Sequence, residues 1–279
     1  MIREVLRRFE EAGFKAELTL FQVEYSATAT LYRHQGRKYA IRQLPTTIAH
    51  LRAFDCYVDL SEQYPSSDAP QIDEMLRWAG LIPDDVPATM KRNCLSIPDA
   101  TKDTYAPMFD ILRKHAGKIL IVHSMASIPE RSMPSEALAR LVQDLLEHTD
   151  YTIVTLCPMR LCGDRALDLS LIANTFWTYS YCISQADAFV TVDTSLFHVA
   201  DAFNIPGVVL FTVEPIARWA SYYPFVTGVQ VSAPVGLEMV CRDTLSRDWD
   251  ALSTRDVVTN LNNIVKYHDT VRSSSGTTH

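Results

Sequence analysis

The sequence predicts an α/β protein with parallel sheets, arranged as two domains, on the basis of three observations. Short β-rich runs alternate with segments of helical period, a pattern typical of parallel strands covered by helices. The chain has 279 residues and is 47% hydrophobic, a length at which two domains are the better expectation. Prolines accumulate among charged residues between positions 82 and 117, which is typical of a linker between domains.

The first half begins with an amphipathic helical pattern over residues 1–13, and Gly13 stands where a left-handed cap is expected. Strands are expected over residues 16–21 and 56–60, and a further helix over residues 69–81. Helix and strand therefore alternate from the start of the chain.

The second half alternates strand and helix more regularly. Its expected strands are residues 118–124, 151–156, 188–193 and 207–211. Its expected helices are residues 134–148, about 177–187, 195–203 and 253–268. The order is Rossmann-like. We expect a Rossmann-like N-terminal domain over residues 1–112 and a second Rossmann-like domain, which binds the ligand, over residues 113–245. A C-terminal helix with a disordered tail is expected over residues 246–279.

Composition argues against several classes of protein. The net charge is −7 without a basic run, which disfavours a nucleic-acid partner, although a local basic groove is compatible with it. No apolar run approaches the roughly 20 residues of a membrane span, and the N-terminus lacks a signal-peptide pattern. The 6 cysteines form no CxxC pair, which favours free thiols in a reducing compartment, and no GxGxxG follows a strand. We expect a cytoplasmic protein.

Asp193, Thr194 and Ser195 lie where an expected strand gives way to an expected helix. In a parallel sheet the carboxyl ends of the strands open onto the crevice where ligands bind. A helix N-terminus there offers unpaired N–H groups and about half a positive charge, so a phosphate group is a suitable ligand. The alternative is that Thr194 or Ser195 simply caps the helix, which is worth about 1 kcal/mol.

The surrounding stretch ISQADAFVTVDTSLFHVADAFNIPGVVLF resembles the segment ADxVVxxDTGxxHLAxALGxPVVxLF of the heptosyltransferase-like glycosyltransferases, family 9 of the GT-B fold. Asp193, Thr194 and His198 stand at the Asp-Thr and His positions of that motif, and Ser195 replaces its usual Gly. A second stretch, LIVHSMASIPERSMPSEALARL, is similar to the segment HPGxxxxxKxWPxExxAxL of the family. The matching positions there are His123, Arg131, Pro134 and Glu136, with Met133 in place of the Trp.

The resemblance implies a GT-B-like pair of Rossmann-type domains, the first of them reduced. It implies an enzyme that moves a sugar from a nucleoside diphosphate sugar to a saccharide or other acceptor, with no cofactor and no metal ion. Arg131 takes the place of the phosphate-contacting Lys, where the alternative is a solvated loop charge. His198 could contact the ligand or pack under the turn, and Asp193 is expected to bond backbone N–H groups. The nucleotide-sugar-binding residues would be Ser124, Arg131, Asp193, Thr194, Ser195 and His198.

One feature of the family has no counterpart in the matching residues. Members normally begin with a strand and a GDxL loop whose Asp is the proposed general base, whereas residues 1–21 align with the family segment that comes after that loop. A neutral hydroxyl is a poor nucleophile, so another carboxylate would have to act as the base. The candidates are Asp55, Asp59 and Glu62, for each of which a turn or capping role is the alternative. Two strand-like stretches within residues 27–44 predict a local hairpin that could replace the first strand.

Two other functions remain compatible with the sequence. One is a phage-type transferase that decorates hydroxymethylated cytosine in DNA, and the other is a catalytically silent relative that binds a nucleotide sugar or a protein. The DWD at residues 248–250 matches the DxD metal motif of another transferase fold, but we expect it in an exposed linker. The aromatic residues of the segment ARWASYYPF (217–225) either pack between the domains or stack against a base or sugar; they are Trp219, Tyr222, Tyr223 and Phe225.

Overall fold

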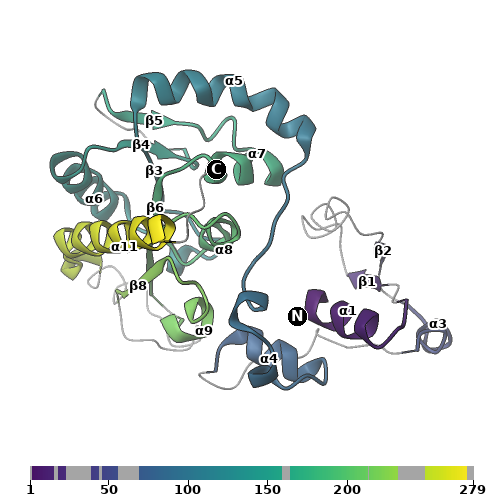
Figure 1. The fold of residues 1–279 in the computed structure, drawn as a ribbon. Coiled ribbons are helices and arrows are strands. Elements are labelled where there is room, and N and C mark those ends of the chain that lie inside the picture. The colour runs from purple at the N-terminus through teal and green to yellow at the C-terminus, as the bar shows by residue number, and fades with distance from the viewer. Residues whose placement is uncertain are drawn as a thin grey trace. The chain divides into compact units, whose positions relative to one another are not determined.

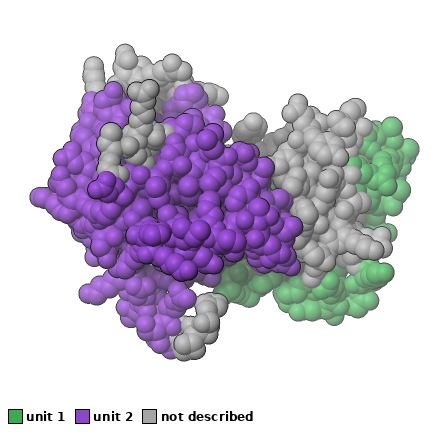
Figure 2. Space-filling view, turned by 90° about the horizontal axis from the view of Figure 1, so that it is seen from above, with its two compact units in different colours: residues 1–92 green, residues 93–279 purple. Residues whose placement is uncertain are grey.

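The computed structural model describes residues 2–15, 18–22, 39–43, 46–55, 69–158, 164–212, 214–231 and 249–274. The chain divides into two compact units, Met1–Arg92 and Asn93–His279, which are coloured separately in Figure 2. The boundary expected between residues 112 and 113 falls inside a helix, and the roles assigned to the two halves stay predictions. Among the described residues, no helix has the combined length and apolar character that a membrane crossing requires.

The first unit opens with helix α1 (Ile2–Glu11), as predicted. Gly13 has φ +83°, and the N–H of Phe14 donates to the carbonyl of Phe9 at 2.9 Å, so the left-handed cap is confirmed. The carboxylate of Glu4 is fully buried and accepts hydrogen bonds from the guanidinium groups of Arg7 and Arg8. These bonds lower the pKa of Glu4 to about 2.

The first unit also contains a two-stranded parallel sheet formed by β1 (Leu18–Gln22) and β2 (Tyr39–Gln43). The hairpin predicted within residues 27–44 is therefore wrong for its second stretch, which pairs in parallel with β1 instead of antiparallel with its neighbour. Parallel pairing needs a crossover connection, whereas a hairpin needs only a tight turn. The first stretch of that hairpin and the expected strand 56–60 lie outside the described residues.

The proline-rich segment predicted as a linker is largely helical. Pro83 begins the 3₁₀ helix Pro83–Asp85, Pro87 precedes a second one at Ala88–Met90, and Pro98 precedes α5 (Asp99–Ala116). Proline is well tolerated at the start of a helix, where its missing N–H would have no partner anyway. The boundary between the two compact units lies inside this segment, after Arg92, so its helical content was not predicted while its role as a linker stays a prediction. The remaining described helices of the first unit are α3 (Ile48–Leu51) and α4 (Gln71–Trp78).

The second unit is built on a six-stranded, all-parallel sheet with the strand order β5-β4-β3-β6-β7-β8 (Figure 1). Four of these strands follow the predicted ranges, while β5 and β8 were not predicted. The sheet order is the doubly wound Rossmann order, in which the chain winds outward in both directions from a central pair. That central pair is β3 and β6. The strands are β3 (Ile119–His123), β4 (Thr152–Thr155), β5 (Ala166–Asp168), β6 (Ala188–Val192), β7 (Gly207–Phe211) and β8 (Val226–Gln230).

Helices cover both faces of this sheet (Figure 1). On one face, the strand residues Leu120 and Val190 pack with apolar side chains of α6 (Ser135–His148) and α11 (Thr254–Ser274). On the other face, Ile121 and Phe189 pack with α5 and two further helices. Alternate residues of each central strand therefore enter different cores, as expected for a sheet buried on both sides. The further helices are α7 (Phe176–Ser184) and α8 (Ser195–Ala202), followed along the chain by the short α9 (Ile216–Ala220).

The C-terminal segment packs into the second unit itself. The apolar face of α11 places Val257 and Leu261 in the same core as α6. Trp249 of the DWD sequence is 1% exposed in that core. The expectation of an exposed linker is thus wrong for Trp249, whose indole anchors the segment that precedes α11, whereas the Asp250 side chain is exposed and Asp248 lies outside the described residues.

Candidate functional site

The candidate site lies at the carboxyl ends of β3 and β6, where the winding of the sheet reverses. From β3 the chain continues to β4 on one side, and from β6 it continues to β7 on the other. In open α/β sheets, ligands bind outside the carboxyl ends of the strands at such a reversal point. His123 ends β3, and Asp193 directly follows β6.

Thr194 and Ser195 stand at the N-terminus of α8. Thr194 is the N-cap with extended backbone angles, φ −152° and ψ 176°, and its side chain makes no capping hydrogen bond. Ser195 begins the helix and is exposed. The structure therefore does not support the capping alternative for Thr194. The first N–H groups of α8 and its positive dipole end are presented together with two hydroxyl groups, an arrangement suited to an anion.

Arg131 and Asp193 form a partly buried ion pair across the central strands. Arg131 ends the 3₁₀ helix Pro129–Arg131 in the segment after β3, and its Nη1 lies 3.1 Å from Oδ2 of Asp193. The side chains are 19% and 4% exposed. Arg131 is thus not a solvated loop charge, and the carboxylate of Asp193 bonds a side chain where backbone N–H groups were expected. Burial raises the pKa of Asp193, and the hydrogen bond from Arg131 opposes the shift.

Ser124 belongs to the base of the segment that carries Arg131. Its carbonyl accepts a hydrogen bond from the N–H of Met133 at 2.8 Å, and its buried Oγ lies 3.6 Å from Sγ of Cys157. The N–H of Ala126 donates to Oγ of Ser132 at 2.9 Å. These bonds close the segment into a loop that returns to its starting point. Ser124 therefore helps to fix the loop from which Arg131 reaches Asp193 at the end of β6.

Tyr179 of α7 belongs to the site, although the sequence did not single it out. Burial raises the pKa of its phenol well above the usual range, and the neighbouring Ser195 side chain opposes the shift. Its ring meets the ring of His123 edge to face, with centroids 5.9 Å apart. Burial lowers the pKa of His123 to about 4, so this imidazole is neutral near pH 7. Only the tertiary placement of α7 against α8 brings these groups together.

His198 lies inside an aromatic cluster. Its Nδ1 is 2.7 Å from the Tyr223 hydroxyl, and its ring centroid is 5.7 Å from that of Trp219. Burial lowers the pKa of His198 to about 4. These contacts hold the ring against the segment that follows β7, and the choice between packing and ligand contact stays a prediction.

The aromatic residues of the segment 218–225 pack within the second unit. Trp219 donates from Nε1 to Glu214 at 3.4 Å, and Glu214 also accepts from Arg218 at 3.0 Å. Phe225 meets the Tyr267 ring of α11 with centroids 6.2 Å apart. Glu214 contributes to the raised pKa of Asp193, so its charge acts on the candidate site. Contacts within this unit, which neither alternative foresaw, thus hold the segment.

The carboxylates proposed as substitute bases are not assembled by the described part of the structure. Asp55 is exposed at the end of a turn that follows α3. Asp59 and Glu62 lie outside the described residues. Their role as bases stays a prediction.

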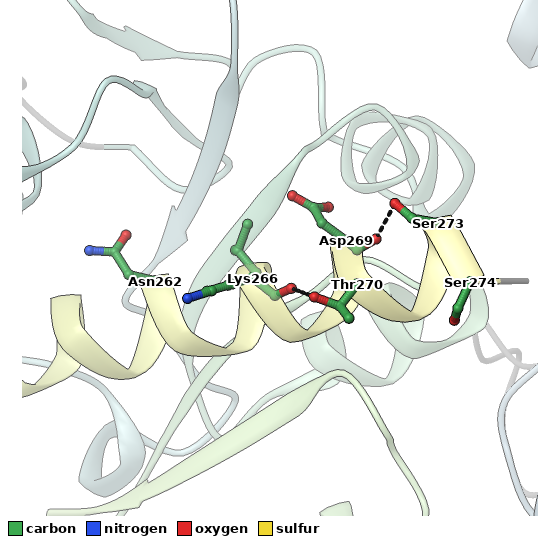
Figure 3. Close-up of a pocket in the computed structure, with 7 residues that line it drawn as sticks. Asn262, Lys266, Asp269, Thr270, Ser273 and Ser274 are labelled. Carbon is green, nitrogen blue, oxygen red and sulfur yellow. Dashed lines mark hydrogen bonds between the residues drawn. The ribbon is translucent and has the colours of Figure 1, made fainter.

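Two other polar features lie away from the sheet edge. A surface hollow runs along α11, and its lining side chains all come from that single helix (Figure 3). Asp144, Glu147 and His148 at the end of α6 have side-chain ligand atoms within 4.8 Å of one another, and the two last residues are exposed. Neither feature combines groups from several elements, as the sheet edge does. The labelled side chains along the hollow are Asn262, Lys266, Asp269, Thr270, Ser273 and Ser274.

Part of the chain is similar to a known family. The sequence model of the family described as Glycosyltransferase family 9 (heptosyltransferase) matches residues 174–245. The matched range contains α7, β6 and α8. The match confirms the predicted resemblance to heptosyltransferase-like glycosyltransferases of family 9 over this part of the chain. Among curated proteins, no match to the chain is found.

Two solved structures share the fold. The ADP-heptose LPS heptosyltransferase II of E. coli is 16% identical with a TM-score of 0.54, over 74% of this chain and 65% of that chain. The glycosyltransferase family 9 protein from Veillonella parvula DSM 2008 is 12% identical with a TM-score of 0.53, over 95% of this chain and 77% of that chain. The likeness confirms the predicted α/β fold of GT-B type. The chain spans less than two thirds of the length of heptosyltransferase II.

Proposed function

We propose that the protein is a glycosyltransferase that binds a nucleoside diphosphate sugar at the carboxyl edge of the second sheet and transfers the sugar to an acceptor hydroxyl. The observation that carries the proposal is the meeting of two positive groups at the central strands: the N-terminus of α8, whose N-cap side chain does not cap it, and the guanidinium of Arg131. Both would face the diphosphate. The family match over residues 174–245 supports the same reaction class.

The described groups suit the departure of a nucleoside diphosphate. When the bond from the sugar to the diphosphate breaks, negative charge grows on the leaving oxygen, and groups already aimed at that charge stabilise the transition state. The first N–H groups of α8, the hydroxyls of Thr194 and Ser195, and the Arg131 guanidinium can supply this stabilisation. We infer that these groups perform the role that a metal ion has in other transferases.

The acceptor must lose a proton as its oxygen attacks the sugar carbon. Asp55, Asp59 and Glu62 remain the candidate bases, and general-base catalysis of this kind contributes typically 10²- to 10⁴-fold. The acceptor is a saccharide or another small hydroxyl compound. ADP-sugars are the first donors to test, because the similar E. coli enzyme is an ADP-heptose transferase. We place the reaction in the cytoplasm, since Cys94, Cys157 and Cys182 are free thiols.

The test is donor binding by calorimetry with a panel of ADP-, GDP-, UDP- and CDP-sugars. We expect at least one to bind the native chain, and we expect Arg131→Ala to weaken that binding at least tenfold, since a charge-assisted hydrogen bond is worth roughly 1.5–3 kcal/mol. Arg131→Gln should show the same loss, because its amide can still donate to Asp193 but carries no charge.

Lys118→Ala provides the matched control. It removes a positive charge from the same unit, where Lys118 forms an exposed ion pair with Asp150 at 3.0 Å. Its affinity for the donor should equal that of the native chain, and thermal unfolding should show that all three variants fold. Unchanged affinity of both Arg131 variants for every sugar nucleotide that binds would refute the site.

A further inference from the structure

Glu214 is a partly buried carboxylate at the same sheet edge as the proposed diphosphate site. It lies three residues beyond the end of β7, and the N–H of Asp193 donates to the carbonyl of Leu210 near the end of that strand at 3.2 Å. The segments that follow β6 and β7 therefore begin next to each other. The charge of Glu214 also contributes to the raised pKa of Asp193, which agrees with this placement.

Two neighbouring side chains hold one oxygen of this carboxylate. Nη1 of Arg218 donates to Oε2 of Glu214 at 3.0 Å, and Nε1 of Trp219 donates to the same oxygen at 3.4 Å. The Trp219 ring meets the ring of His198 with centroids 5.7 Å apart, and His198 lies about one turn after Ser195 in α8. These contacts tie the carboxylate to the first turns of α8.

The other oxygen of Glu214 is not used by these contacts. Among the described residues, Oε1 of Glu214 has no hydrogen-bond partner, and Nε of Arg218 is buried without one. The side chains of Glu214 and Arg218 are 19% and 17% exposed, so the pair is not sealed from solvent. A sugar hydroxyl both donates and accepts hydrogen bonds, so a carboxylate oxygen beside a guanidinium suits such a group.

We propose that Glu214 is a specificity-determining residue that accepts a hydrogen bond from a hydroxyl group of the transferred sugar; this inference rests on the proposed function. Such a bond is strong, because the acceptor is charged. Glu214 and Asp193 would repel the diphosphate, whereas they favour a sugar ring on which positive charge grows as its glycosidic bond breaks. Arg218 and Trp219 are then positioning residues, since they hold the carboxylate through Oε2.

The test compares the binding of sugar nucleotides and of nucleoside diphosphates by calorimetry on the full chain. The probes are ADP-, GDP-, UDP- and CDP-sugars, each paired with its nucleoside diphosphate, and the sugar nucleotide that binds the native chain most tightly defines the pair used. Glu214→Gln keeps the size of the side chain and removes its charge. It should weaken binding of the sugar nucleotide about tenfold, as expected for one hydrogen bond to a charged group.

The affinity of Glu214→Gln for the nucleoside diphosphate, which lacks the transferred sugar, should stay equal or rise, because a repelling charge is lost. Asp150→Asn is the matched control. It removes a carboxylate from an exposed ion pair with Lys118 in the same unit and should bind both probes like the native chain. If thermal unfolding shows that Glu214→Gln does not fold, Glu214→Asp replaces it. Its carboxylate is one methylene shorter, so it should show the same selective loss.

The ratio of the two affinities decides the inference. A loss confined to the sugar nucleotide supports it. Native affinity for both probes overturns it, and so does an equal loss for both, which would indicate a contact with the ribose or a merely structural role. Neither of these results changes the Arg131 result that tests the proposed function. If the native chain binds no sugar nucleotide and no nucleoside diphosphate, the proposed function falls and the inference falls with it.

Discussion

Burial decides the charge of the histidines at the candidate site. His123 stands against Tyr179, and His198 stands among aromatic rings, and for both the loss of hydration lowers the pKa to about 4. Both rings are therefore neutral in the folded protein near pH 7. An unfolded chain would give them a pKa near 6.5. Neither imidazole can then serve as a cation for the diphosphate, which leaves that task to Arg131 and the dipole of α8.

These lowered pKa values predict how stability depends on pH. Between pH 6.5 and about 4 the unfolded chain binds protons that the folded protein does not, so the free energy of unfolding falls as the pH falls. Each histidine contributes a slope of about 1.4 kcal/mol per pH unit within this window, and its contribution is fully present above pH 6.5. Urea unfolding at several pH values measures the slope.

Two variants assign the slope to its residue. His198→Phe should remove about half of the pH slope that the two histidines give to the free energy of unfolding. Tyr223→Phe should lower stability through the lost hydrogen bond to His198 without changing that slope. An identical slope in the native chain and in His198→Phe would show that this ring is not held neutral by burial.

Among the elements of the sheet, β6 and β7 approach each other closely at Gly207, the first residue of β7. A Cβ atom built there would lie 2.4 Å from both the carbonyl oxygen and the ring Cδ1 of Phe189. No side chain fits without moving β6, which ends directly before Asp193. The glycine thus permits the strand spacing that positions the site.

We predict that Gly207→Ala destabilises the protein by roughly 1–3 kcal/mol, the usual cost of overpacking a core. Gly228→Ala is the matched comparison, since its Cβ would meet only the side chain of Ile216, at 2.5 Å. That side chain can move at smaller cost, so chemical denaturation should show a smaller loss. Equal losses for the two variants would contradict the close approach of β6 and β7 at Gly207.

The elements of the second unit could be predicted because their apolar runs are long and regular. The strands at residues 119–123, 188–192 and 207–211 carry continuous buried residues, which a single sequence reveals. Strand β5 has only three residues and β8 is half-buried, so neither has a clear pattern. The parallel pairing of β1 with β2 also escaped prediction, because pairing partners depend on tertiary contacts.

The candidate site was predicted only in part, because some of its residues follow from local patterns and others from tertiary contacts. Asp193, Thr194 and Ser195 follow from the position of a strand end, which periodicity locates. The ion pair of Asp193 with Arg131 joins residues far apart in the chain, and the family resemblance indicated Arg131 only as a phosphate ligand. Tyr179 carried no local signal, because an aromatic residue in a helix is usually part of a core.

In the molecule as a whole, the second unit contains every described group that we propose to bind the nucleoside diphosphate sugar. Its sheet, both of its cores and α11 lie within residues 93–279. The first unit contains the carboxylates proposed as bases, of which the structure describes Asp55. Under the proposed function, we expect donor binding to depend on the second unit and transfer to need the carboxylates of the first unit as well. We expect binding to be detected more readily than turnover.

Binding of the sugar-nucleotide diphosphate at the N-terminus of α8 is the step on which the proposed function depends. A crystal structure of the full chain with the nucleoside diphosphate that binds most tightly would locate that group. We predict phosphate oxygens within hydrogen-bond distance, about 2.7–3.2 Å, of the first N–H groups of α8, the Ser195 hydroxyl and the Arg131 guanidinium. A diphosphate bound elsewhere, with the first turn of α8 facing only solvent, would contradict this placement.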